Sequence, residues 1–205
     1  MKTINIYLLR HGKTSGLPAL YGRTDVAVAT DIQVAICNGV QALQLGVETI
    51  VTSPLQRCRV AADLLHQTLD IPLTVIDDFQ EMHFGDVDGV PFDELTEQWS
   101  TLEQFWTQPA QVTLPNAESL GEFHVRITQA WKALCRHAEQ DTLVVCHGGT
   151  IRMILASILG MDWQNPSLYS VLSIDNQSLT HITLTDKQYF RVRSIGRPIS
   201  AIDTI

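Results

Sequence analysis

The stretch TINIYLLRHG, residues 3–12, decides the fold. Residues 3–9 are mostly β-branched or apolar, which is typical of a buried strand. A second apolar run, TLVVC at residues 142–146, leads in the same way into the sequence HGG. Two buried strands that each end in a His-Gly pair indicate an α/β fold with polar side chains at the strand ends.

Strand and helix signals alternate along the rest of the chain. Further strands are expected over 49–52, over 73–76 and, two or three in number, after Ser170 around an Asp186-Lys187 turn. Helices are expected over 30–46, from Ser53 as N-cap to near Asp70, within 91–108, from Ser119 through Cys135, and from Gly149 to Gly160. This alternation predicts a three-layer α/β/α sandwich with a mostly parallel central sheet and helices on both faces. We expect one domain, residues 1–205, with a small helical cap inserted around 84–117.

The composition restricts the class of protein. Of the residues, 45% are hydrophobic and 18% are charged, which is an ordinary globular mixture. The net charge of −8 argues against a nucleic-acid partner, and no stretch is apolar enough to predict a membrane span. The four cysteines show no CxxC spacing, and the first residues do not resemble a signal peptide. A cytoplasmic protein is therefore expected; the sequence leaves the oligomeric state open.

Two histidines and two arginines are expected at one edge of the sheet. His11 and His147 each follow a strand, and ligand sites of α/β sheets lie at the carboxyl ends of strands. Arg10 precedes His11, and Arg57 lies near the start of the helix that follows strand 49–52. Guanidinium groups and helix N-termini bind phosphate well. We therefore predict a phosphate site that also includes the backbone of Gly148.

The expected site can carry out phosphoryl transfer. A neutral imidazole can attack phosphorus in line with the leaving oxygen. The leaving alkoxide then needs a proton, for which Glu81, after the third strand, is the best candidate. In a second step water would attack the phosphohistidine, with Glu81 as base. Arg10, Arg57 and His147 would stabilise the phosphoryl oxygens.

Four motifs in this order resemble the histidine phosphatase superfamily, in the branch that contains cofactor-dependent phosphoglycerate mutase. They are LLRHGKT at 8–14, SPLQR at 53–57, EMHFGDVDG at 81–89 and CHGG at 146–149. The resemblance implies that His11 becomes phosphorylated. It also implies that Arg10, Arg57 and His147 hold the phosphoryl group, that Glu81 donates the proton, and that no metal or other cofactor is needed. The partner would be a small phosphate monoester.

Within that branch, LYGRTDVAV at 20–28 and EMHFGD are similar to the α-ribazole-5′-phosphate phosphatases. This resemblance implies hydrolysis of α-ribazole-5′-phosphate, or of the cobamide phosphate, in cobalamin biosynthesis. The chain departs from the family pattern at three positions: Leu17 replaces a common Asn, Lys13 a common Glu, and Ala117 the Gly of a GES motif. We expect the substrate entrance to involve four residues: Thr14, Tyr21, Arg23 and His83.

Several alternatives stay open. The chain could be a phosphoglycerate mutase-like enzyme or a broad-specificity sugar or nucleotide phosphatase, or it could bind phospho-ligands without catalysis. The segment from Cys146 to Arg152 also fits the C-x-x-G-x-x-R loop of cysteine-dependent phosphatases, although Met153 stands where a hydroxyl residue is usual. That reading leaves the other three motifs unexplained. No HExxH or comparable pattern predicts a metal site.

Overall fold

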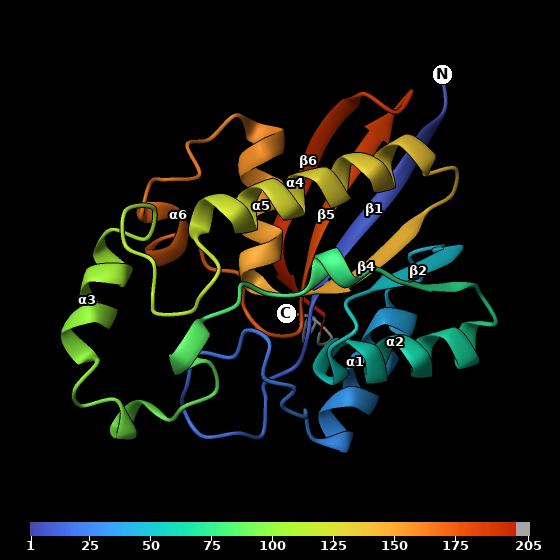
Figure 1. Ribbon diagram of the computed structural model, residues 1–205. Coiled ribbons are helices and arrows are strands. Elements are labelled where there is room, and N and C mark those ends of the chain that lie inside the picture. The colour runs from blue at the N-terminus through green and yellow to red at the C-terminus, as the bar shows by residue number, and fades with distance from the viewer. Residues whose placement is uncertain (200–205) are drawn as a thin grey trace, which may run out of the picture.

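A six-stranded sheet runs through the molecule in the order β3-β2-β4-β1-β5-β6 (Figure 1). The computed structural model describes residues 1–199 of the chain. The strands are β1 (Thr3–Arg10), β2 (Thr49–Thr52), β3 (Leu73–Val75), β4 (Thr142–Cys146), β5 (Ser178–Thr185) and β6 (Tyr189–Pro198). Strands β3, β2, β4 and β1 are parallel, whereas β5 runs antiparallel to both β1 and β6. The predicted α/β fold with a mostly parallel sheet is confirmed.

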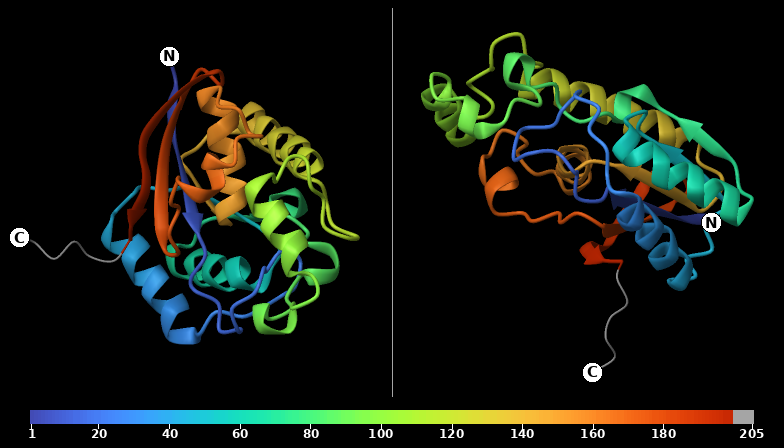
Figure 2. Two further views of the ribbon diagram at one scale, coloured as in Figure 1. Left: turned by 90° about the vertical axis from the view of Figure 1, so that its left-hand side faces the viewer. Right: turned by 90° about the horizontal axis from the view of Figure 1, so that it is seen from below.

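Helices cover both faces of the parallel part of the sheet (Figures 1 and 2). The α-helices are α1 (Thr30–Ala42), α2 (Gln56–Leu69), α3 (Trp99–Thr107), α4 (Leu120–His137), α5 (Gly148–Leu159) and α6 (Ser167–Ser170). Successive strand residues point to opposite faces. Leu8 and Val144 therefore belong to the core under α4 and α5, while Leu9 and Val145 belong to the core under α1 and α2. This double burial explains why both strands are mostly apolar.

Helix boundaries follow the sequence signals only in part. Ser119 caps α4 as expected: its hydroxyl accepts the Glu122 N–H at 3.2 Å, and the Glu122 carboxylate accepts the Ser119 N–H at 2.9 Å. In contrast, α1 ends at Ala42 and not at Gly46. The expected start of α2 is also wrong, because the helix begins at Gln56 and Ser53 makes no N-cap. The Ser53 side chain is directed to another partner, described below.

The two C-terminal strands form a hairpin. Asp186 and Lys187 both have positive φ, 49° and 59°, as the two central residues of a type I′ turn require. The tail therefore holds two of the expected two or three strands within the described residues. Residues 1–199 contain no helix with the length and apolar character needed to span a membrane.

Residues 84–117, called here the cap segment, lie beside the layers of the sandwich (Figure 1, green). The segment contains α3 and the short 3₁₀ turns η2 (Gly85–Val87) and η3 (Phe92–Glu94); a further turn, η1 (Asp77–Phe79), precedes it. Leu95, Leu102 and Leu114 are almost completely buried and join the core under α4 and α5. The cap segment is thus anchored by apolar packing.

Candidate active site

The carboxyl ends of β1 and β4 bring two histidines together. Arg10 pairs with Cys146 at the last position of the parallel ladder, so the next residue of each strand leaves the sheet at the same place. The ring centroids of His11 and His147 lie 5.2 Å apart, in an edge-to-face arrangement. The backbone N–H of His11 donates to the Cys146 carbonyl at 3.1 Å, which fixes the exit of β1.

His11 is held as a neutral imidazole. Its ring is nearly buried, and Nδ1 lies 2.7 Å from the Gly12 carbonyl oxygen. A carbonyl only accepts, so Nδ1 carries the proton and Nε2 keeps its lone pair. Burial lowers the pKa of His11 to about 3, and the nearby charges of Arg57 and Arg10 act in the same direction against the Gly12 carbonyl. A neutral imidazole with a free Nε2 lone pair is the form that can attack phosphorus.

His147 is completely buried and both of its ring nitrogens have partners. Arg57 Nε donates to Nδ1 at 3.2 Å, and Nε2 lies 2.8 Å from Ser53 Oγ. Since Nδ1 accepts, the Nε2–H donates to Ser53. Burial lowers the pKa of His147 well below its ordinary value, helped first by Arg57. A direct bond from His147 to a phosphate, as the sequence predicts, would require exchanging one of these two partners.

Arg57 supports the loop at 21–24. Its guanidinium group is fully buried and donates to the carbonyls of Thr24 at 2.9 Å, Tyr21 at 3.0 Å and Gly22 at 2.6 Å. Together with the bond to His147 this uses four of its five N–H groups, which leaves one for a ligand. Arg57 therefore connects the loop to the second histidine.

Asp88 holds the same loop from its other side. Its carboxylate accepts the backbone N–H groups of Gly22 at 3.2 Å, Arg23 at 2.8 Å and Thr24 at 2.9 Å. Burial alone would raise the pKa of Asp88, but the hydrogen bonds from Phe84, Thr24 and Arg23 bring it below its ordinary value. The loop is clamped between a cation on its carbonyls and an anion on its N–H groups.

Glu81 lies at the N-terminus of α5. Its Oε2 accepts the Gly149 N–H at 2.9 Å, and its Oε1 accepts the Met82 N–H at 3.2 Å. A Cβ atom on residue 149 would come within 2.3 Å of Oε1, so only glycine leaves room for the carboxyl group there. The HGG sequence thus ends β4 and also leaves room for the Glu81 carboxyl group at the N-terminus of α5.

Two guanidinium groups flank Gly148. A Cβ atom at this position would lie 3.3 Å from Arg10 Cζ and 3.1 Å from Arg152 Nη1. Arg10 donates to the Ile174 carbonyl, and Arg152 donates to the Leu172 carbonyl through Nε at 3.1 Å and Nη2 at 2.9 Å. Sequence analysis considered Arg152 only for the cysteine alternative. Its place one helical turn after Gly148 is the signal that could have identified it.

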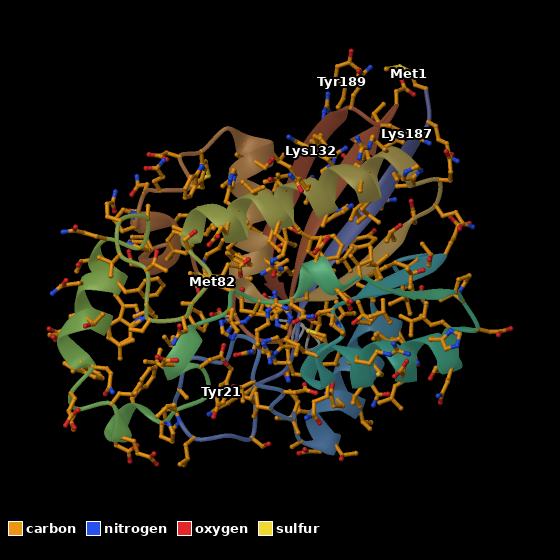
Figure 3. All side chains as sticks on the ribbon, viewed as in Figure 1. Met1, Tyr21, Met82, Lys132, Lys187 and Tyr189 are labelled. Carbon is orange, nitrogen blue, oxygen red and sulfur yellow. The ribbon has the colours of Figure 1, made fainter. Side chains whose placement is uncertain are left out.

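A cavity of about 400 Å³ opens in front of His11. Its wall includes Arg10, His11, Lys13, Thr14, Gly16, Leu17, Pro18, Ala19, Leu20, Tyr21, Glu81, Phe84 and Asn176. Asn176 was missed by sequence analysis; its side-chain amide donates to the His11 carbonyl at 3.0 Å. In Figure 3, Tyr21 lies near this region, between α3 and α1. Arg57, His147 and Gly148 lie behind the wall and do not line it.

Two of the four expected entrance residues do not line this cavity. Thr14 and Tyr21 are part of its wall. The Arg23 side chain instead bonds the Gln80 side chain, and His83 Nδ1 accepts the Gly85 N–H at 3.2 Å. His83 therefore stabilises its own turn, and Arg23 braces the segment that leads to Glu81.

Cys146 is placed unfavourably for nucleophilic attack. It is fully buried, belongs to the apolar core under α4 and α5, and does not line the cavity. Burial raises the pKa of its thiol well above the ordinary value, which disfavours the reactive thiolate. Within residues 1–199 no three His, Cys, Asp or Glu side chains are grouped to hold a metal ion.

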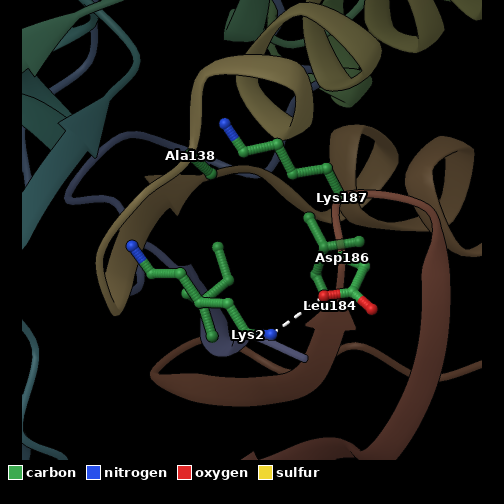
Figure 4. A pocket seen from close by; sticks show the side chains of 6 residues that line it. Lys2, Ala138, Leu184, Asp186 and Lys187 are labelled. Atoms are coloured by element: carbon green, nitrogen blue, oxygen red, sulfur yellow. Dashed lines mark hydrogen bonds between the residues drawn. The ribbon is translucent and has the colours of Figure 1, made fainter.

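A separate cavity of about 220 Å³ lies at the opposite end of the sheet, where β1 begins (Figure 4). Lys2 and Lys187 line it, and both bond the Glu139 carboxylate. The Lys2 backbone N–H also donates to Asp186 Oδ1 at 2.9 Å. Because the carboxylates of Glu139 and Asp186 balance the two ammonium groups, this cavity offers little attraction to an anionic ligand.

The chain matches a protein family model and curated proteins over most of its length. The family model of the histidine phosphatase superfamily (branch 1) matches residues 6–196. A Bacillus subtilis (strain 168) protein named "Uncharacterized phosphatase PhoE" is 29% identical over 188 residues, which cover 90% of each chain. "Probable phosphoglycerate mutase GpmB" of Salmonella arizonae is 27% identical, over 91% of this chain and 87% of that protein.

Solved structures share the fold at lower identity. A mycobacterial glucosyl-3-phosphoglycerate phosphatase superposes with a TM-score of 0.82 at 18% identity, covering 96% of this chain and 100% of the other. The α-ribazole phosphatase of Shigella flexneri superposes with a TM-score of 0.80 at 21% identity, covering 94% and 96%. Similar folds thus occur in enzymes named for different phosphate esters.

Proposed function

The chain belongs to the histidine phosphatase superfamily (branch 1), and from this membership we propose that it hydrolyses a small phosphate monoester through a phosphohistidine on His11. The observation that carries the proposal is the state of His11. Its Nδ1–H is tied to the Gly12 carbonyl, and its ring faces a cavity that Arg10 and Glu81 also line. Nucleophile, cation and acid thus share one wall.

In the first step, the His11 Nε2 lone pair forms a bond to phosphorus while the bond to the ester oxygen breaks. The departing oxygen takes the proton of the Glu81 carboxyl group, and the alcohol leaves. In the second step, a water molecule gives a proton to Glu81 and attacks phosphorus, which breaks the N–P bond. Inorganic phosphate leaves, and both residues return to their starting forms.

The phosphoryl oxygens would be stabilised by groups at the rim of the sheet. Arg10 lies beside His11 and borders the cavity. The N-terminus of α5 adds the backbone N–H of Gly148 and a partial positive charge. Arg57 contributes its remaining N–H, and His147 acts through the Arg57 bond or by direct contact after exchange of a partner. Removing one such group typically lowers the rate by about 10²–10³.

For the substrate itself we propose α-ribazole-5′-phosphate, or the corresponding cobamide phosphate, in a cytoplasmic route to cobalamin. The segment LYGRTDVAV, 20–28, supports this assignment through its resemblance to α-ribazole phosphatases. Part of it, residues 21–24, is the loop that Arg57 and Asp88 clamp beside the cavity. A phosphoglycerate mutase-like or broad-specificity activity is the second candidate, favoured by the GpmB relative.

A substrate panel tests both levels of the proposal. Purified protein in excess EDTA is assayed with α-ribazole-5′-phosphate, sugar phosphates, nucleotides and phosphoglycerates. We expect phosphate release, a preference of more than about tenfold for α-ribazole-5′-phosphate, and loss of about 10⁴-fold or more in His11→Ala. Isomerisation of 3-phosphoglycerate that depends on 2,3-bisphosphoglycerate would instead establish a mutase. An active His11→Ala with an inactive Cys146→Ala would establish the cysteine mechanism, and no turnover of any ester would leave a binding module.

A further inference from the structure

A second cavity adjoins the one in front of His11. This annex has a volume of about 240 Å³. It is lined by Leu20, Glu81, Met82, Phe84, Phe105, Trp106, Pro109, Leu120, Phe123, Gly149, Arg152 and Tyr169. Leu20, Glu81 and Phe84 line both cavities, so the two cavities are neighbours that share these three residues. Together they reach the size range of small-molecule sites, roughly 300–1,000 Å³.

The position of Glu81 decides which part of the ester enters the annex. His11 lines only the first cavity, where the phosphoryl group must lie to be attacked. In-line attack places the leaving oxygen on the far side of phosphorus from the nucleophile. That oxygen must also lie within hydrogen-bond reach of Glu81, which borders the annex. Because Glu81 lines both cavities, the alcohol part of the substrate can extend past its carboxyl group into the annex.

Aromatic side chains form much of the annex wall. The rings of Phe84 and Phe105 pack edge to face with centroids 6.2 Å apart. Trp106 is held in turn by Trp99 at 5.6 Å and by Phe92 at 6.0 Å, and it is still 39% exposed. The exposed surface of Trp106 thus belongs to a side chain that its neighbours hold in place. Such a side chain loses little conformational freedom when a ligand binds.

From this arrangement we propose that the annex binds an aromatic or similarly planar apolar leaving group, and that Trp106 sets this specificity. The inference rests on the proposed phosphatase function, since it uses the places of His11 and Glu81. Burial of one ring against such walls is expected to favour a ring-bearing ester by about tenfold or more over a short alkyl ester. Highly hydrated sugar alcohols would lose this advantage.

The test compares two esters with the same kind of leaving oxygen. Ethyl phosphate and 2-phenylethyl phosphate both release a primary alkoxide, so they differ mainly in the ring that reaches the annex. We expect kcat/KM for 2-phenylethyl phosphate to exceed that for ethyl phosphate by about tenfold or more. We also expect 2-phenylethanol, and not ethanol, to inhibit the wild-type enzyme at millimolar concentration.

Trp106→Ala and Trp99→Ala form a matched pair of variants. Both tryptophans lie on α3, they are 39% and 41% exposed, and they pack against each other, but only Trp106 lines the annex. Trp106→Ala should lower kcat/KM for 2-phenylethyl phosphate about tenfold while ethyl phosphate changes by less than about twofold. Trp99→Ala should change the ratio of the two esters less than Trp106→Ala does, because Phe92 still supports Trp106.

Two results would overturn the annex proposal. Equal kcat/KM for the two esters in the wild type, or a Trp106→Ala variant that lowers both alike, overturns the annex proposal and leaves the phosphatase function intact. Inhibition by 2-phenylethanol gives an answer that does not depend on how the variants fold. If neither ester nor any member of the substrate panel is hydrolysed, the proposed function fails and the annex proposal fails with it.

Discussion

The rim of the sheet and the cap segment border the same ligand space but are built differently. The rim carries polar groups that directly follow strands, and their hydrogen bonds join distant parts of the chain, as in the contacts of His147 with Ser53 and Arg57. The cap segment contributes aromatic side chains, such as the adjacent Phe105 and Trp106 on α3. We infer that the rim determines the chemistry and that the cap segment determines which ester undergoes it.

This division has a measurable consequence. A change at the rim alters the transition state for phosphoryl transfer, so it should lower the rates for all esters by a similar factor. A change in the cap segment alters the contacts of the leaving group, so it should change the ratio between esters. The predictions below test this separation at the rim, from the largest expected effect to the smallest.

The largest effect is expected from Gly149→Ala. The added methyl group would overlap Glu81 Oε1, so the carboxyl group must leave its place on the α5 N-terminus. We predict a loss of about 10²–10³ in kcat for both ethyl and 2-phenylethyl phosphate. An ester with a good leaving group, such as 4-nitrophenyl phosphate, should lose much less, because it needs no proton from Glu81.

Gly121→Ala is the matched control for this variant. Gly121 is likewise the second residue of a helix, α4, but a Cβ atom there would meet only ordinary contacts, the nearest at 3.5 Å from Trp163. The control should keep full activity. The role assigned to Gly149 is wrong if its alanine variant stays folded and hydrolyses alkyl esters at the wild-type rate.

The second prediction concerns the stability of the protein at acidic pH. The pKa of His11 is about 3 in the folded protein and near 6.5 in the unfolded chain, so between these values only the unfolded chain binds the proton. Stability must therefore fall as the pH falls below about 6.5. The expected slope from this group is about 1.4 kcal/mol per pH unit.

His11→Asn isolates that contribution because it removes the titrating group. Urea unfolding of both proteins at pH 7, 6, 5 and 4 gives the difference in unfolding free energy at each pH. The wild type should lose stability faster than the variant as the solution is acidified. A difference that stays constant over this range would show that His11 titrates in the folded protein as it does in the unfolded chain.

The smallest effect is expected from Asp88→Asn. The amide keeps one acceptor oxygen for the loop at 21–24, but the charge that strengthens three backbone hydrogen bonds is lost. We predict a rise in KM of about three- to tenfold with a small change in kcat. Asp86→Asn, at an exposed residue that bonds Asn116, should change neither. Equal effects of the two variants would contradict the loop clamp.

Much of the fold and part of the site follow from local sequence signals. Apolar runs predict β1 and β4, and two strands that end in His-Gly predict where the histidines meet, because parallel strands share an edge. The glycines after His147 indicate that another group lies close to the backbone there. That this group is the Glu81 carboxyl, which lies against Gly149, becomes evident only in the folded structure.

The remaining features depend on contacts between residues far apart in the chain. Ser53 has the local signature of an N-cap, yet its hydroxyl bonds His147, and the helix begins only at Gln56. Asn176 lies far along the chain from His11, and nothing beside it in the sequence marks that partner. Arg152 lies one turn after Gly148, but its bond to the Leu172 carbonyl joins it to a later segment. The annex could not be predicted from the sequence either. An aromatic residue on an amphipathic helix is expected to lie in the core unless its neighbours in the fold are known.

Trapping the covalent intermediate tests the central claim most directly. Enzyme mixed with substrate is quenched within the first turnovers in alkali, digested, and its phosphopeptides are mapped by mass spectrometry. We predict one phosphate, acid-labile and base-stable, on the peptide of His11, and none in His11→Asn. Phosphate on Cys146 instead, or steady turnover from an enzyme that never becomes phosphorylated, would contradict the account.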